Sequence, residues 1–134
     1  MVDYITGING IGKSRIMFET AVATAEISKG NVVFVDSKNK LNRMLPPNIR
    51  LINADDCGVH GAKAMYGFLA GLCAGNYDIT DVFVDSTAEI IGDSTNFDDF
   101  FELMAKLSER TGVDFHFSVC DKYSDELVYQ TAEL

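Results

Sequence analysis

The sequence predicts an α/β protein with a mostly parallel sheet that helices cover on both faces. Two runs rich in β-branched and apolar residues, 32–36 and 81–86, have the composition of strands buried on both faces. Two other stretches, 60–74 and 97–107, carry apolar residues at the three- and four-residue spacing of amphipathic helices. Because helical crossovers connect neighbouring parallel strands, this alternation favours one sheet between two helical layers.

The first half of the chain is expected to alternate strand and helix. Residues 3–6 (DYIT) form a short strand candidate that leads directly into a glycine-rich loop. A helix is expected over 13–28, since no Gly or Pro interrupts this stretch and Gly30 stands where helices commonly end. Strands are then expected at 32–36 and 49–54.

The second half repeats this alternation. The apolar stripe in 60–74 predicts a helix that ends at Gly75, and the stripe from Phe97 to Leu107 predicts a helix that ends before Gly112. Three strands are expected to accompany these helices, at 81–86, 114–119 and 126–131. Because no linker or low-complexity tract divides the chain, residues 1–134 are expected to form a single domain.

Composition argues against several classes of function. The formal net charge of −9 opposes a polyanionic partner, so we expect no direct nucleic-acid binding, which depends on clustered Lys and Arg. No apolar run approaches the roughly 20 residues of a membrane span and no signal-type segment opens the chain, so we expect a cytoplasmic protein without membrane contact. The three cysteines include no CxxC pair, which indicates neither a disulfide framework nor a zinc site.

The strongest motif is GINGIGKS at residues 7–14, which fits the pattern G-x-x-x-x-G-K-[ST] between a strand and a helix. In this pattern the glycines let backbone N–H groups turn towards a phosphate chain, and the helix N-terminus adds partial positive charge. Lys13 can then reach the β- and γ-phosphates, and the Ser14 hydroxyl can bind Mg²⁺. The alternative interpretation is a glycine-rich turn that binds nothing.

A phosphate-binding loop of this kind needs a carboxylate elsewhere that positions the metal. Asp36 and Asp85 both follow apolar strands, and Asp85 is preferred because it follows the later one. The alternative is that either Asp caps the turn after its strand, where Asp is common.

The order of these motifs resembles the nucleotide-binding core of the RecA-like and KaiC-like ATPases over the whole chain, with GINGIGKS as the phosphate loop and DVFVDS as the metal strand. The resemblance implies a three-layer P-loop NTPase fold whose first strand lies between the strands at 114–119 and 126–131. It also implies ATP as ligand, with Mg²⁺ held by Ser14 and Asp85. The residues expected to contact nucleotide are Asn9, Gly10, Ile11, Gly12, Lys13, Ser14 and Arg15, although Arg15 could instead face solvent.

One position departs from the family pattern. In the family, a Glu two residues after the Asp of the second strand polarises the attacking water, and Lys38 occupies the matching position here. A protonated amine is a poor general base at neutral pH, although Lys38 could stabilise phosphate charge. Asp36 could take the place of the family Glu if it points towards the γ-phosphate. Asp36 and Lys38 are therefore the catalytic candidates. We therefore expect a weak or partner-dependent ATPase.

The resemblance raises two further expectations. Nucleotide lies between subunits in many RecA-like proteins, so a homo-oligomer or another protein partner is expected. A polar residue among Ser118, Cys120 and Asp121 is expected to sense the γ-phosphate.

Two other functions remain open. A module that binds ATP as a switch without efficient hydrolysis is favoured by Lys38 and the short chain. A small-molecule kinase would share the loop but needs an Arg-rich lid, and segment 87–113 contains only Arg110, so this alternative ranks last.

Overall fold

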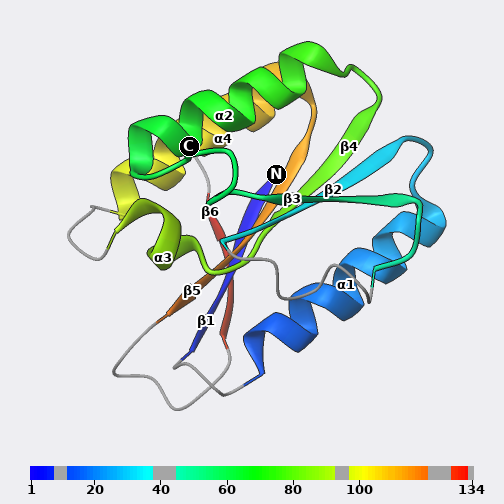
Figure 1. Ribbon diagram of the computed structural model, residues 1–134, viewed down its shortest axis with the longest axis horizontal. Coiled ribbons are helices and arrows are strands. Elements are labelled where there is room, and N and C mark those ends of the chain that lie inside the picture. Colours follow the sequence, from blue (N-terminus) through cyan, green and yellow to red (C-terminus); the bar gives the residue numbers. More distant parts are fainter. Residues whose placement is uncertain (8–11, 38–44, 93–96, 121–127, 133–134) are drawn as a thin grey trace.

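The computed structural model describes residues 1–7, 12–37, 45–92, 97–120 and 128–132. Over these residues the backbone forms a six-stranded sheet with the order β3-β2-β4-β5-β1-β6, drawn as arrows in Figure 1. The strands are β1 (Val2–Gly7), β2 (Asn31–Asp36), β3 (Ile49–Asn53), β4 (Ile79–Val84), β5 (Asp114–Cys120) and β6 (Val128–Ala132).

Parallel pairing dominates this sheet, as the sequence predicts. The first five strands pair in parallel wherever they are neighbours, and β6 is the one described strand that runs antiparallel, beside β1. The position of β1 between β5 and β6 is the one that the family resemblance implies. The carboxyl ends of the five parallel strands lie together, and we call this side of the sheet its carboxyl end.

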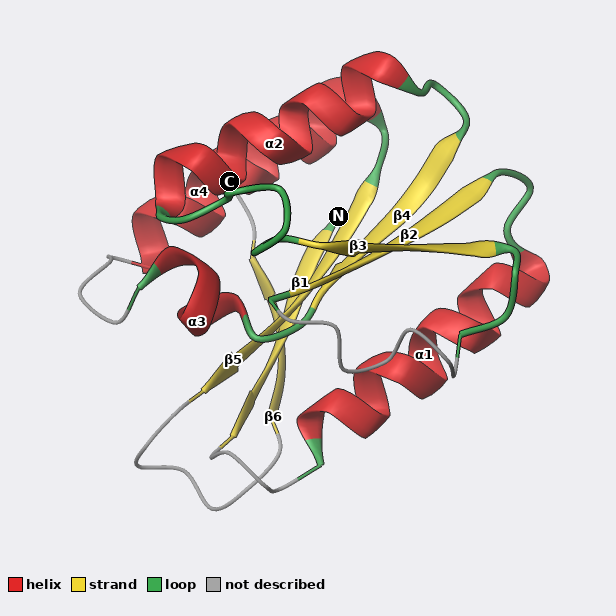
Figure 2. Cartoon of the chain, viewed as in Figure 1, coloured by secondary structure: helices red, strands yellow, loops and turns green. Residues whose placement is uncertain are grey.

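Helices cover both faces of the sheet, which confirms the predicted layering. Figure 2 shows α1 on one face and α2 and α4 together on the other, with the short α3 at the carboxyl end of the sheet. No helix in the described ranges is long and apolar enough to cross a membrane. The helices are α1 (Lys13–Ile27), α2 (Ala62–Gly75), α3 (Thr87–Ile91) and α4 (Phe97–Thr111).

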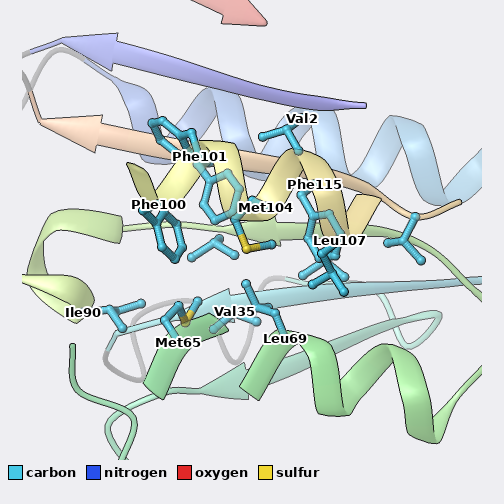
Figure 3. Close-up of a cluster of buried hydrophobic side chains, with 14 of the residues drawn as sticks. Val2, Val35, Met65, Leu69, Ile90, Phe100, Phe101, Met104, Leu107 and Phe115 are labelled. Carbon is cyan, nitrogen blue, oxygen red and sulfur yellow. The ribbon is translucent and has the colours of Figure 1, made fainter. Parts of the chain in front are cut away.

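The apolar core has two parts because strand side chains alternate between the faces. In β4, Val82 and Val84 pack on the side of α2 and α4, whereas Phe83 packs on the side of α1. Figure 3 shows the larger part, where side chains of α4 and α2 meet those of the sheet. Its aromatic contacts include the stacked rings of Tyr4 and Phe101, whose centroids lie 4.6 Å apart. This packing fixes α4 on the sheet.

Some predicted boundaries were wrong, and one of them affects the site. The strand predicted at 81–86 lies at Ile79–Val84, so Asp85 and Ser86 belong to the turn that follows it. Ser86 has a φ of 57°, in the left-handed region, which ends the strand sharply. Helix α3 was not predicted, because five residues are too few to show helical periodicity. The last strand, predicted at 126–131, is described at Val128–Ala132 and ends one residue later than predicted, while residues 126 and 127 lie outside the described ranges.

Candidate functional site

The described ends of the glycine-rich segment lie where the sequence predicts them. Strand β1 ends at Gly7, and α1 begins at Lys13. Gly12 precedes the helix with a φ of 105°, a conformation that favours glycine because it has no Cβ. The predicted nucleotide-contacting residues Asn9, Gly10 and Ile11 lie outside the described residues.

Lys13 is buried, which is unusual for a lysine. Its side chain is 8% exposed, and its Nζ donates a hydrogen bond to the carbonyl oxygen of Gly7 at 2.5 Å. The ammonium therefore joins the two described ends of the glycine-rich segment and lies at the carboxyl end of β1.

The next two residues face outward from the first turn of α1. Ser14 is exposed, so its hydroxyl is accessible at the N-terminus of the helix. Arg15 is also exposed, and its Nε lies 3.5 Å from Oε1 of Glu19 one turn further along. The structure thus places Ser14 at the loop and shows Arg15 in a solvent-exposed ion pair.

Two buried carboxylates lie side by side at the carboxyl end of the sheet. Val35 of β2 pairs with Val84 of β4, so the next residues, Asp36 and Asp85, are neighbours in the same register. Asp36 is 1% exposed and Asp85 is 2% exposed. A buried carboxylate is costly unless hydrogen bonds or opposite charges compensate it. Asp36 Oδ1 accepts a hydrogen bond from the backbone N–H of Ser37 at 2.8 Å.

Asp85 is held by the neighbouring strand β5. The hydroxyl of Ser118 donates to Oδ1 of Asp85 at 2.5 Å and accepts a hydrogen bond from the backbone N–H of Ser86 at 2.9 Å. Because Ser118 is itself buried, this short network fixes the orientation of the Asp85 carboxylate. Of the three polar residues expected near a γ-phosphate, Ser118 thus contacts Asp85, Cys120 ends β5, and Asp121 lies outside the described residues.

The described ends of the glycine-rich segment and the two carboxylates lie at the same end of the sheet. Asp85 follows Phe83, and Ser118 follows His116, at the two-residue spacing that directs side chains to the face covered by α1. Strand β5 separates β4 from β1. Two strand spacings of about 4.8 Å separate Asp85 laterally from β1, and the register places it level with Ile5, two residues before the end of that strand.

The structure adds two residues that the sequence interpretation missed, Ser37 and Glu89. The Ser37 hydroxyl donates to Oε2 of Glu89 at 2.8 Å, which links the end of β2 to α3. The signal in the sequence was Ser86-Thr87-Ala88-Glu89, an S-x-x-E pattern typical of a helix start. Ser86 is indeed the residue before α3, but it makes no side-chain capping bond there, and Glu89 contacts β2. Lys38, the catalytic candidate that follows Ser37, lies outside the described residues.

A second polar cluster lies on the same face of the sheet, towards the amino ends of the strands. His116 lies between two carboxylates, with Nδ1 2.7 Å from Oδ1 of Asp3 and Nε2 2.9 Å from Oδ2 of Asp81. Burial alone would lower the pKa of His116, but the hydrogen bonds and charges of the two carboxylates outweigh it and raise the pKa to about 9. Burial opposes the charge of Asp81 too, yet contacts led by the His116 hydrogen bond lower its pKa.

The comparisons with known proteins add little. No protein-family model matches the chain, and no curated protein matches it in sequence. One solved structure with a detectable likeness comes from a study titled "Redox regulation of Plasmodium falciparum ornithine delta-aminotransferase". The match has 16% identity and a TM-score of 0.39, and it covers 86% of this chain but only 28% of that one. A likeness at this TM-score indicates neither fold family nor function.

Proposed function

We propose that the chain is a Mg²⁺-dependent ATP-binding protein of RecA-like P-loop type, and a weak or partner-dependent ATPase. The observation that carries this proposal is that a buried ammonium, at the start of α1, and a buried carboxylate, directly after β4, both lie at the carboxyl end of the sheet. Lys13 joins the ends of the glycine-rich segment, and Asp85 lies at the end of β4, held by Ser118 of the intervening strand. Buried ionisable groups gathered at the end of a parallel sheet favour a ligand site over a plain turn.

The strand order supports the same proposal. The glycine-rich segment follows β1, which lies between β5 and β6, the position that the resemblance to the RecA-like ATPases implies. Strand β5 separates β1 from β4, the strand that Asp85 directly follows. In open α/β sheets, ligands bind beyond the carboxyl ends of the strands, which is where these residues gather.

The chemistry of the loop suits a phosphate chain. Backbone N–H groups at the start of α1 and the helix dipole favour negative charge. On binding, the Lys13 ammonium would exchange its hydrogen bond with the Gly7 carbonyl for hydrogen bonds to phosphate oxygens, in which donor and acceptor are both ionised. The start of α1 therefore suits a ligand with several phosphate charges.

The oxygen donors at this end of the sheet fit Mg²⁺, which prefers carboxylate, hydroxyl and water oxygens. Ser14 offers an exposed hydroxyl at the first turn of α1, and Asp85 offers a carboxylate whose orientation Ser118 fixes. We assign Mg²⁺ to Ser14 and Asp85. Bound there, the ion would neutralise charge on the β- and γ-phosphates.

Isothermal calorimetry with Mg-ATP tests the proposal. Wild-type protein is expected to bind, and Lys13→Ala is expected to weaken binding by about 10-fold or more, because the change removes a charge-assisted contact to phosphate. Lys106→Ala is the matched control, since Lys106 lies on α4 with its Nζ 3.9 Å from Glu102 Oε1, and the change should leave affinity unchanged. No binding by wild-type protein at millimolar nucleotide would overturn the proposal.

Phosphate release, measured beside binding, separates the three functions. An ATPase that needs no partner releases phosphate from ATP alone, whereas binding without release indicates a switch module or an ATPase that requires its partner. A kinase consumes ATP only when a small acceptor is added.

A further inference from the structure

Glu89 differs from the other carboxylates that follow β2 and β4. Asp36 and Asp85 are almost completely buried, whereas Glu89 is exposed. A group that takes a proton from water must contact water. Glu89 therefore has the access to solvent that a general base needs, and the two aspartates do not.

Glu89 lies at the carboxyl end of the sheet, only a few residues after the end of β4. Helix α3 begins at Thr87, two residues after Asp85, so Glu89 lies within the first turn beyond the end of β4. Its Oε2 accepts a hydrogen bond from Ser37, which directly follows Asp36 at the end of the neighbouring strand. Ser37 is buried, and its backbone carbonyl pairs with the N–H of Asp55, so the donor that orients Glu89 is itself fixed.

We propose that Glu89 orients the water that attacks the γ-phosphate and accepts its proton, and that Ser37 is a positioning residue for Glu89. The inference rests on the proposed ATP hydrolysis. The water oxygen bonds to the γ-phosphorus as the bond from that phosphorus to the β–γ bridging oxygen breaks. ADP leaves with the electron pair of the broken bond. Glu89 receives the water proton and then passes it to phosphate or solvent.

The proposed general base is neither Asp36 nor Lys38, the two catalytic candidates that the sequence predicts. The Asp36 carboxylate is buried and its Oδ1 accepts a hydrogen bond from Ser37, so it serves the turn after β2. Lys38 carries a protonated amine at neutral pH and cannot accept a proton from water. The carboxylate instead comes from α3, on a different element from the one that the family pattern uses.

Glu89→Gln tests the inference, because it keeps the size and hydrogen bonding of the side chain but removes the charge. We expect phosphate release to fall about 10²-fold, the effect typical of losing a general base. Calorimetric affinity for Mg-ATP should stay within about twofold, whereas affinity for Mg-ADP with aluminium fluoride should fall about 10-fold, since that complex mimics the transition state. Glu109→Gln, an exposed Glu on α4, is the matched control and should change none of the three.

Three further variants separate positioning from chemistry. Ser37→Ala should lower kcat several-fold without raising KM, and Ser37→Thr, which keeps the hydroxyl, should restore it. Lys38→Glu introduced into Glu89→Gln should recover part of the lost rate, because it supplies a carboxylate next to Ser37.

The outcomes distinguish this inference from the proposed function. If wild-type protein binds no Mg-ATP, the proposed function fails and the inference fails with it. Suppose instead that wild-type protein binds and hydrolyses ATP and Glu89→Gln does both equally well; then only the assignment of Glu89 is wrong. Binding without any hydrolysis by wild-type protein also overturns the assignment, while leaving an ATP-binding module.

Discussion

Two clusters of polar side chains, one partly buried and one buried, lie on the face of the sheet that α1 covers, and they differ in how their charge is compensated. Towards the amino ends of the strands, His116 bridges Asp3 and Asp81, so a cation lies between two anions. At the carboxyl end, Asp85 is held by the neutral hydroxyl of Ser118. The first cluster contains its own cation, whereas in the second the described hydrogen bonds hold Asp85 by a neutral hydroxyl.

This difference indicates different roles. A carboxylate that is already paired with a cation gains little from a metal ion, and the ring nitrogens of His116 are both engaged. A carboxylate that a hydrogen bond orients can be a metal ligand. We therefore expect a structural role for the cluster of His116, Asp3 and Asp81, and propose ligand binding for Asp85 and Ser118. The two roles predict different responses to substitution, a loss of stability at the first cluster and a loss of binding at the second.

The largest expected effect is on stability, at the His116 cluster. His116→Phe should lower the free energy of unfolding by about 2–4 kcal/mol, because it leaves two partly buried carboxylates facing each other without their cation. Denaturant unfolding measures this change. His60→Phe is the control, since His60 is exposed and its Nε2 lies 3.6 Å from Asp55 Oδ1, and it should cost less than about 0.5 kcal/mol. An equal loss of unfolding free energy in the two variants would show that the His116 cluster has no special structural role.

The next effect is the dependence of stability on pH. The pKa of His116 rises from an unfolded value near 6.5 to about 9, so the folded chain holds the extra proton between these values. Its stabilising contribution is complete below pH 6.5 and is lost as pH rises through 9. Asp81 acts in the opposite direction, because its lowered pKa gives stability that is lost in acid.

Thermal unfolding between pH 6 and pH 10 checks this expectation. Wild-type stability should fall by on the order of 1–3 kcal/mol across the window, and His116→Phe should show a much smaller slope. A wild-type slope that survives in the variant would mean that another group titrates there.

At the carboxyl end of the sheet the expected effect is on binding instead. Asp85→Asn should weaken Mg²⁺-dependent ATP binding by about 10-fold, because the amide keeps the shape but loses the charge that a hard cation needs. Asp36→Asn should weaken it less. Calorimetry with and without Mg²⁺ measures both. The reverse ranking would assign the metal ligand to Asp36 after β2 instead of Asp85 after β4. An equally large effect without Mg²⁺ would show that Asp85 does not act through the metal.

The smallest effect is expected at Lys38. Lys38→Glu in the wild-type background should raise the rate of phosphate release a few-fold, well below the roughly 10²-fold effect of an essential base, because Glu89 already supplies one. Nucleotide affinity should change little. Phosphate release at ordinary enzyme rates of about 1–10³ s⁻¹ from wild-type protein, with no effect of Lys38→Glu, would show that this position does not limit the rate.

The sequence predicted best those strands whose residues are buried on both faces of the sheet. The β-branched run of β2 is apolar on both faces, so its strand was predicted almost to the residue. The strand before the glycine-rich segment and the helix after it were predicted equally well, since β1 ends at Gly7 and α1 begins at Lys13. Helix α3 was not predicted, since one turn of helix leaves no periodic signal.

The clusters could not be predicted because they depend on strand register. His116 is 113 residues from Asp3 and 35 from Asp81, and only the pairing of β5 with β1 and β4 brings the three together. Ser37 and Glu89 are 52 residues apart and meet because β2 and β4 are neighbours. Local patterns name the residue types in such contacts but not their partners.

The most direct test of the account is a crystal structure of the protein with Mg²⁺ and a non-hydrolysable ATP analogue. The account predicts that the Lys13 ammonium leaves the Gly7 carbonyl for the β- and γ-phosphates, and that Mg²⁺ lies between Ser14 and Asp85. It also predicts an ordered water between the γ-phosphate and Glu89. An analogue bound away from the glycine-rich segment, with Lys13 still hydrogen-bonded to Gly7, would contradict the account.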